Sequence, residues 1–151
     1  MKLHIKRFYE ETGTKSVMKG RSIVFVSKEL EKISEKVRSD EDVLALMSFG
    51  SYARSEEFSD IDVCVVLKPG KFDPLFLSKK RLEYLVVFPN LDVQVFQQLP
   101  LYVRVRVLKE GKVLFCRSED LLYDLSFSTV RQFEYFKPIY LSYLKGVSNA
   151  R

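Results

Sequence analysis

The chain has 151 residues, a net charge of +5 and 46% apolar residues, values typical of one globular domain that can bury a core. Its apolar runs are too short to span a membrane and its first residues lack a signal peptide's apolar stretch, so we expect a cytoplasmic protein. Cys64 and Cys116 lack zinc-ligand spacing and are expected to be reduced thiols. The moderate positive charge suits a protein that handles a nucleotide, whereas no direct nucleic-acid binding is expected.

The beginning of the chain predicts a small hairpin or arm over residues 1–26. Within it, residues 22–26 are apolar and mostly β-branched, a pattern typical of a short strand. Ser27 is a good N-cap, and apolar residues at helical spacing follow it. We therefore expect a helix over residues 29–37, near the start of a core over residues 27–117.

Two short apolar segments follow and predict neighbouring strands. Residues 43–49 form an apolar run of strand length that stops at Gly50. Residues 51–56 are expected to form a short helix or turn. Residues 60–67 form the second strand, which ends at the turn signal Lys68-Pro69-Gly70-Lys71.

The middle of the chain predicts a helix over residues 74–85, with Leu75, Leu82 and Leu85 on one side. After it, residues 86–88 and 91–96 look like one interrupted strand or two short ones.

Residues 102–107 give conflicting signals. Their strict alternation favours a strand, whereas Pro100 before them and Gly111 after them favour a helix. Ser118 then caps a helix expected to run to about residue 136, where Pro138 kinks or restarts it before an end near Gly146. Strands and helices alternate along the chain, so we predict an α/β (α+β) fold, a small mixed sheet flanked by helices, with a helical extension over residues 118–151 packed on the core.

Two aspartates stand one residue apart at the head of the second predicted strand. Residues two apart on a strand point to the same face, so Asp60 and Asp62 project together. Adjacent carboxylates repel each other unless a cation lies between them, and oxygen-only ligands suit Mg²⁺ or Mn²⁺. Asp92, in a similar apolar setting, can supply a third carboxylate. Three such groups can hold two metal ions roughly 3.5–4 Å apart, an arrangement typical of phosphoryl-type transfer.

A glycine-serine step precedes the aspartates and predicts a phosphate-binding turn. Gly50 lets a phosphate approach the backbone, and the N–H groups at the start of the following short helix favour an anion. The Ser51 hydroxyl adds a donor, and Arg54 one turn later is a candidate charge clamp. A plain turn and a solvated strand entrance are the alternative interpretation, which the ordered combination with Asp92 disfavours.

These motifs resemble the minimal nucleotidyltransferases (MNT) of the DNA polymerase beta superfamily. The resemblance rests on Gly50-Ser51-Tyr52-Ala53-Arg54, Ser59-Asp60-Ile61-Asp62-Val63 and Leu91-Asp92-Val93. Residues 106–115 and 133–138 resemble the tail of the MNT antitoxins that are partnered with HEPN-domain toxins. The loop from Tyr52 to Ser59 is shorter than usual for the family, and Ser55 stands where a glycine is common.

The resemblance implies an adenylyltransferase that binds magnesium-ATP, with two Mg²⁺ ions or Mn²⁺, and places AMP on a tyrosine of a HEPN ribonuclease toxin. Gly50 and Ser51 would hold the triphosphate, Asp60 and Asp62 the metals, and Asp92 would complete the metal site and help the acceptor hydroxyl to lose its proton. The resemblance also favours a helix over residues 100–109.

Two other functions stay open: a nucleotidyltransferase that acts on a small molecule or an RNA end, and an antitoxin that only binds its toxin. The C-terminal helix is rich in aromatic residues, which can cover the sheet or form a partner surface. They are Tyr123, Phe127, Phe133, Tyr135, Phe136, Tyr140 and Tyr143. Arg104, Arg106 and Lys109 can meet a partner's acidic patch, the nucleotide or only solvent.

Overall fold

The computed structural model describes residues 23–50 and 61–150 of the chain. In chain order its elements are α2 (Ile23–Ser39), β1 (Val43–Phe49), β2 (Ile61–Leu67), α3 (Pro74–Val87), β3 (Leu91–Val95), the 3-10 turn η1 (Phe96–Gln98), α4 (Leu101–Glu110), β4 (Lys112–Cys116) and α5 (Glu119–Asn149). The predicted α/β fold with a small mixed sheet and a C-terminal helix is confirmed.

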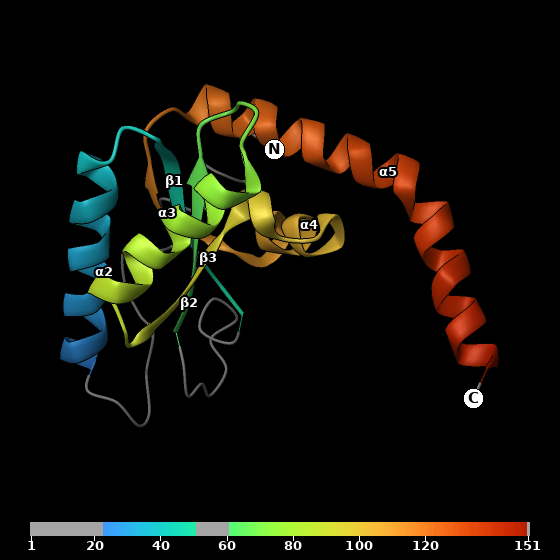
Figure 1. Cartoon of the computed structure of the whole chain (residues 1–151), viewed down its shortest axis with the longest axis horizontal. Helices are drawn as coiled ribbons and strands as arrows, with labels where there is room; N and C mark the ends of the chain where they lie inside the picture. Colours follow the sequence, from blue (N-terminus) through green and yellow to red (C-terminus); the bar gives the residue numbers. More distant parts are fainter. Residues whose placement is uncertain (1–22, 51–60, 151) are drawn as a thin grey trace.

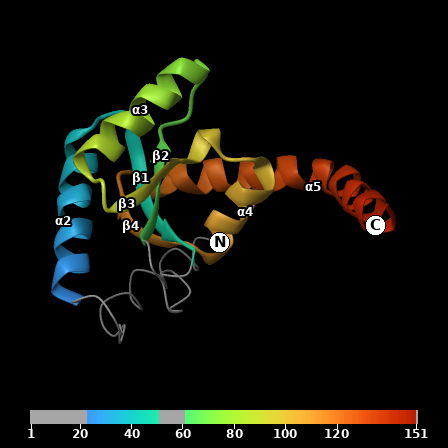
Figure 2. The ribbon, with the colours of Figure 1, turned by 60° about the horizontal axis from the view of Figure 1, so that its bottom comes forward.

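The strands form one sheet in the order β3-β2-β1-β4 (Figure 1). β1 pairs antiparallel with β2 and with β4, whereas β2 and β3 are parallel. Helices cover both faces: α2 and α3 lie on one side and α4 and α5 on the other, as the turned view shows (Figure 2). The central strands β1 and β2 are therefore buried on both sides, which explains their nearly continuous apolar sequences.

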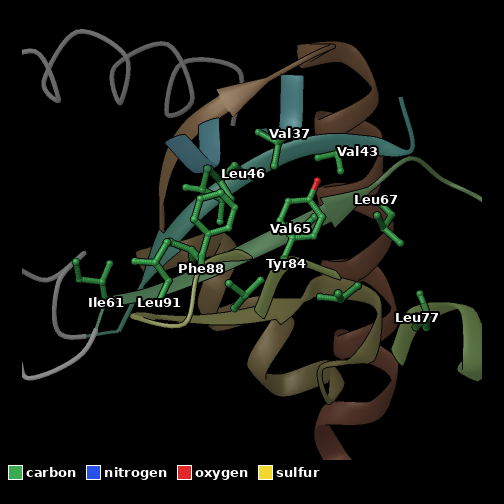
Figure 3. Packing of buried hydrophobic residues seen from close by; sticks show 14 residues of the cluster. Val37, Val43, Leu46, Ile61, Val65, Leu67, Leu77, Tyr84, Phe88 and Leu91 are labelled. Atoms are coloured by element: carbon green, nitrogen blue, oxygen red, sulfur yellow. The ribbon is translucent and has the colours of Figure 1, made fainter. Parts of the chain in front are cut away.

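The core beneath α2 and α3 packs around Tyr84, which is fully buried and lies against Val65 of the sheet (Figure 3). Val37 from α2 and Leu77 from α3 join the same cluster. The cluster on the opposite face contains Cys64 and residues from α4 and α5. The two clusters hold the sheet rigidly, which fixes the positions of side chains at its rim.

Three local predictions are wrong where a helix extends further than its sequence pattern. Residues 23–26, predicted as part of a strand, belong to α2, so Ser27 lies inside that helix and is not its N-cap. Val86 and Val87 likewise continue α3. Once a helix is nucleated, adding a β-branched residue costs only a few tenths of a kcal/mol, so a short β-branched run is a weak barrier.

Of the three leucines predicted to share one side of α3, Leu85 is partly buried against the core. Leu75 is 61% exposed and Leu82 is 58% exposed, whereas Leu77, Lys80 and Tyr84 are buried. The buried positions recur at helical spacing, but two of them carry polar ends that hide the pattern. Lys80 is buried because its ammonium group contacts the carboxylate of Asp40 at 2.9 Å.

α5 neither ends nor restarts at Pro138. It runs unbroken to Asn149, with Ser118 as its N-cap, as predicted. Its second half changes direction and extends away from the sheet (Figure 1), as expected where a proline removes one helical hydrogen bond. Every residue from 141 to 150 is exposed.

Candidate functional site: two aspartates beside a glycine turn

Two of the three predicted aspartates occupy neighbouring strands at the same level. Asp62 of β2 and Asp92 of β3 are Cα partners in the parallel pairing. Because partnered residues project to the same side of a sheet, both side chains face the layer of α4 and α5. Cys64, two residues after Asp62, packs in the core on that face. The half-buried Asp62 and the exposed Asp92 therefore stand together at the rim of the sheet.

Gln94 orients the carboxylate of Asp92. Its side-chain Nε2 donates a hydrogen bond to Asp92 Oδ1 over 3.0 Å. The two residues are two apart on β3, so they share a face. Gln94 is not among the site residues predicted from the sequence, although its spacing of two residues from Asp92 was the available signal. Such a bond fixes the direction of the second oxygen of the carboxylate.

Gly50 is required at the end of β1 for two reasons. Its φ is +73°, in the left-handed region that disfavours residues with a Cβ. A Cβ placed there would overlap Oδ2 of Asp62 and would lie 3.3 Å from its Cγ. The neighbouring Phe49 is the Cα partner of Asp62 across the sheet. The glycine therefore gives the Asp62 carboxylate its place beside the turn.

The other predicted site residues, Ser51, Arg54 and Asp60, lie outside the described residues. In the ranges 23–50 and 61–150, no group of three or more His, Cys, Asp or Glu residues could hold a metal ion. The Asp62–Asp92 pair nevertheless fits a divalent cation, because two carboxylates project from registered positions and offer only oxygen ligands. Asp60 belongs to the same predicted set.

The three basic residues of α4 have different environments. Arg104 is half-buried, and its guanidinium donates to the carbonyl oxygens of Leu99 at 2.8 Å and Gln97 at 3.3 Å. Burial lowers the pKa of Arg104, but the two backbone bonds give it a structural role at the start of the helix. Arg106 and Lys109 are exposed. Only Arg106 of these three lines a pocket together with Gly50.

A second charged cluster lies under the opposite face and is structural. Lys80 contacts Asp40 at 2.9 Å and Asp42 at 3.1 Å, and the Tyr84 hydroxyl donates to Asp40 at 2.9 Å. Burial opposes ionisation of Asp40, but the hydrogen bonds from Lys80 and Tyr84 outweigh it and lower the pKa of Asp40. The cluster joins α3 to the loop before β1, on the opposite side of the sheet from the layer that the aspartate pair faces.

This fold and this rim define the chain as a nucleotidyltransferase domain. It belongs to the family described as "Polymerase beta, Nucleotidyltransferase", which matches residues 31–120. The match spans β1, β2, β3 and α4, and so contains both aspartates and Gly50. The polymerase beta relationship that the sequence motifs imply is thereby confirmed.

One curated relative is similar over part of its length. A Methanocaldococcus jannaschii protein named "putative protein adenylyltransferase" is 33% identical over 79 residues, which cover 48% of this chain and 56% of the relative. Just over half of that relative's length is therefore matched.

Solved structures share the fold. A chain of a toxin–antitoxin crystal structure with AMP-PNP superimposes with a TM-score of 0.61 and 18% identity, covering 79% of this chain and 98% of that one. A chain from the complex of tri-AMPylated Shewanella oneidensis HEPN toxin with MNT antitoxin gives 0.60 and 16%, covering 81% and 98%. None of the described helices combines the length and apolarity needed to cross a bilayer.

Proposed function

We propose that this chain transfers AMP from ATP to a tyrosine hydroxyl of a HEPN-domain ribonuclease toxin and thereby acts as its antitoxin in the cytoplasm. The observation that carries the proposal is the registered pair Asp62 and Asp92 beside the left-handed Gly50 in a polymerase beta family domain. Two names support a protein as the acceptor of AMP. One relative is called "putative protein adenylyltransferase", and one structure with the same fold is a complex of an AMPylated HEPN toxin with an MNT antitoxin.

In this proposal Gly50 and Ser51 receive the β- and γ-phosphates, and Arg54 adds a positive charge. Asp60, Asp62 and Asp92 would hold one or two Mg²⁺ ions, or Mn²⁺. When bound, these ions would neutralise the negative charge of the α-phosphate. The reason for the proposed phosphate turn is physical: Gly50 has no side chain, so the backbone is open to a close approach.

The transfer is a substitution at the α-phosphorus of ATP. The acceptor oxygen forms a bond to that phosphorus, the bond to the bridging oxygen breaks, and pyrophosphate leaves. Asp92 accepts the proton of the acceptor hydroxyl. The hydrogen bond from Gln94 holds the Asp92 carboxylate in one direction, so that a base is positioned for the acceptor hydroxyl.

The partner is proposed to bind at the aromatic part of α5. Tyr135 is 79% exposed and Tyr143 is 66% exposed, and Ile139 lies between them on the same helix. Such residues are enriched in protein interfaces and costly to expose together. In the same proposal residues 118–151 form a helical extension and the catalytic core ends at residue 117. The core includes all of α2, so the boundary predicted between residues 26 and 27 moves to the start of that helix at Ile23.

The test is transfer to the genetic neighbour. The full chain is incubated with magnesium-ATP and the HEPN-domain product of the adjacent gene, and the intact mass of that product is measured. Addition of one or more adenylyl groups is expected with the natural chain and not with Asp62→Asn or Asp92→Asn. A stable inhibitory complex with no added mass would establish binding-only neutralisation instead. Label from ATP on a small molecule or an RNA end, with none on protein, would reassign the acceptor.

A further inference from the structure

A pocket of about 140 Å³ lies between the end of β1 and one side of α4. Phe49 and Gly50 line it from the strand. From the helix it is lined by Val103, Arg106, Val107 and Glu110, whose spacing of three, one and three residues places them on one helical face. Gly50 is thus shared by the pocket and by the contact with Asp62.

The pocket has the size and walls of a slot for a flat ring. Its volume is close to that of the ~150 Å³ cavity that accommodates one benzene ring. Phe49, Val103 and Val107 provide apolar walls, and the charged ends of Arg106 and Glu110 belong to exposed residues of its lining. Apolar walls with a few convergent polar groups are typical of sites for small planar ligands.

The hydrogen-bonding groups of Arg106 and Glu110 together match the edge of adenine better than the corresponding edge of guanine. Arg106 can only donate hydrogen bonds, whereas the carboxylate of Glu110 can only accept them. Adenine offers one acceptor, N7, beside one donor, the N6 amino group. Guanine offers two acceptors, N7 and O6, on the corresponding edge, so its O6 would face the carboxylate without a proton between them.

From these features we propose that the pocket holds the base of the nucleotide and that Arg106 and Glu110 make the enzyme selective for adenine over guanine. This inference rests on the proposed function, because it assumes that the triphosphate lies at Gly50. Phe49 and the two valines contact the ring faces. Arg106 donates to N7, and Glu110 accepts from the N6 amino group. Arg104, which is held by backbone carbonyls, takes no part.

The experiment measures affinity without turnover, using the full chain in the absence of any acceptor. Calorimetric titrations with magnesium-ATP, magnesium-GTP and magnesium-tripolyphosphate, which has no base, are made on the natural chain and on Arg106→Ala, Glu110→Gln and Lys109→Ala. Lys109 is the matched control, because it is an exposed cation on the same helix that does not line the pocket. Thermal melting of each variant verifies folding.

The natural chain is expected to bind ATP on the order of ten-fold more tightly than GTP, the scale of one good pair of base contacts. Glu110→Gln should remove that preference, because an amide can also donate to O6. Arg106→Ala should weaken ATP about ten-fold and leave tripolyphosphate unchanged, and Lys109→Ala should change neither.

Either of two results with the variants would overturn the inference, as would either of two results with the natural chain. Equal losses of ATP and tripolyphosphate affinity in Arg106→Ala would mean that Arg106 contacts phosphate. An unchanged ATP-to-GTP ratio in folded Glu110→Gln would mean that Glu110 does not face the base. Nucleotide binding without base preference in the natural chain also removes the inference but leaves the proposed function standing, whereas no nucleotide binding at all removes both.

Discussion

Replacing Gly50 by alanine tests whether the turn at the end of β1 positions the Asp62 carboxylate. The left-handed backbone at Gly50 should cost an alanine about 1–2 kcal/mol of folding free energy. For a chain of this length, that loss lowers Tm by roughly 2–8 °C. The new Cβ would also overlap Oδ2 of Asp62, so the carboxylate must move by ~1 Å, a displacement that can reduce a rate on the order of a hundred-fold.

The assay is the initial rate of adenylyl transfer to the HEPN-domain partner, measured beside a thermal melt of the same preparation. Gly70→Ala is the matched control, because its Cβ would meet only the Phe72 ring, at the ordinary contact distance of 3.6 Å. That control should change neither Tm nor rate appreciably. If Gly50→Ala lowered Tm as expected and kept a transfer rate within two-fold of the natural chain, Gly50 would be a turn residue without influence on Asp62, and the reasoning would be refuted.

Three further predictions concern the second aspartate, the buried charge cluster and α5. Gln94→Leu removes the hydrogen bond that orients Asp92, so it should lower the transfer rate while leaving Tm nearly unchanged; a rate equal to that of the natural chain would contradict the orienting role. Lys80→Ala leaves Asp40 buried without its cation and should reduce the free energy of unfolding by about 3 kcal/mol in denaturant titrations. The pKa of Asp40 is lowered in the folded state. The ionised Asp40 therefore adds to the stability of the fold above its ordinary pKa of 3.8, and this stability is lost as pH falls through the folded-state pKa. Below pH 4 the Tm of the natural chain should consequently fall more steeply than the Tm of Lys80→Ala. Tyr135→Ala with Tyr143→Ala should weaken the complex with the HEPN-domain partner by at least ten-fold in a binding titration and leave Tm within a degree or two, whereas unchanged affinity would place the partner elsewhere.

The strands could be predicted from the sequence because each is a compact apolar run that ends at a turn signal. β1 was predicted at its observed bounds, and β2 differs only at Asp60, which lies outside the described residues. Their register could not be predicted, because the pairing of Asp62 with Asp92 is a contact between distant segments set by the whole sheet. The motif therefore indicated which carboxylates belong together, and the fold shows that two of them stand at one level.

Helical faces were harder to predict than helical segments, since burial on a helix depends on what packs against it. In α3 a buried lysine and tyrosine occupy the inner side, and their polar ends meet a carboxylate that the sequence places forty residues earlier. The leucines alone do not mark the buried side, because Leu75 and Leu82 are exposed whereas Leu85 is partly buried against the core. β4 was not predicted at all, because its five residues become a strand only by pairing with β1.

The segment with conflicting signals shows how one local choice determines the chemistry of the site. As a strand, residues 102–107 would have placed Arg104 and Arg106 on the same face, and both would have pointed to the same partner. In the helix that forms instead, two residues apart means directions about 200° apart. Arg104 consequently bonds to Leu99 O and Gln97 O at the base of α4, and Arg106 lines the pocket beside Gly50. The helix thus separates a structural arginine from one that is available to a ligand, and only the second belongs in any account of what this enzyme binds.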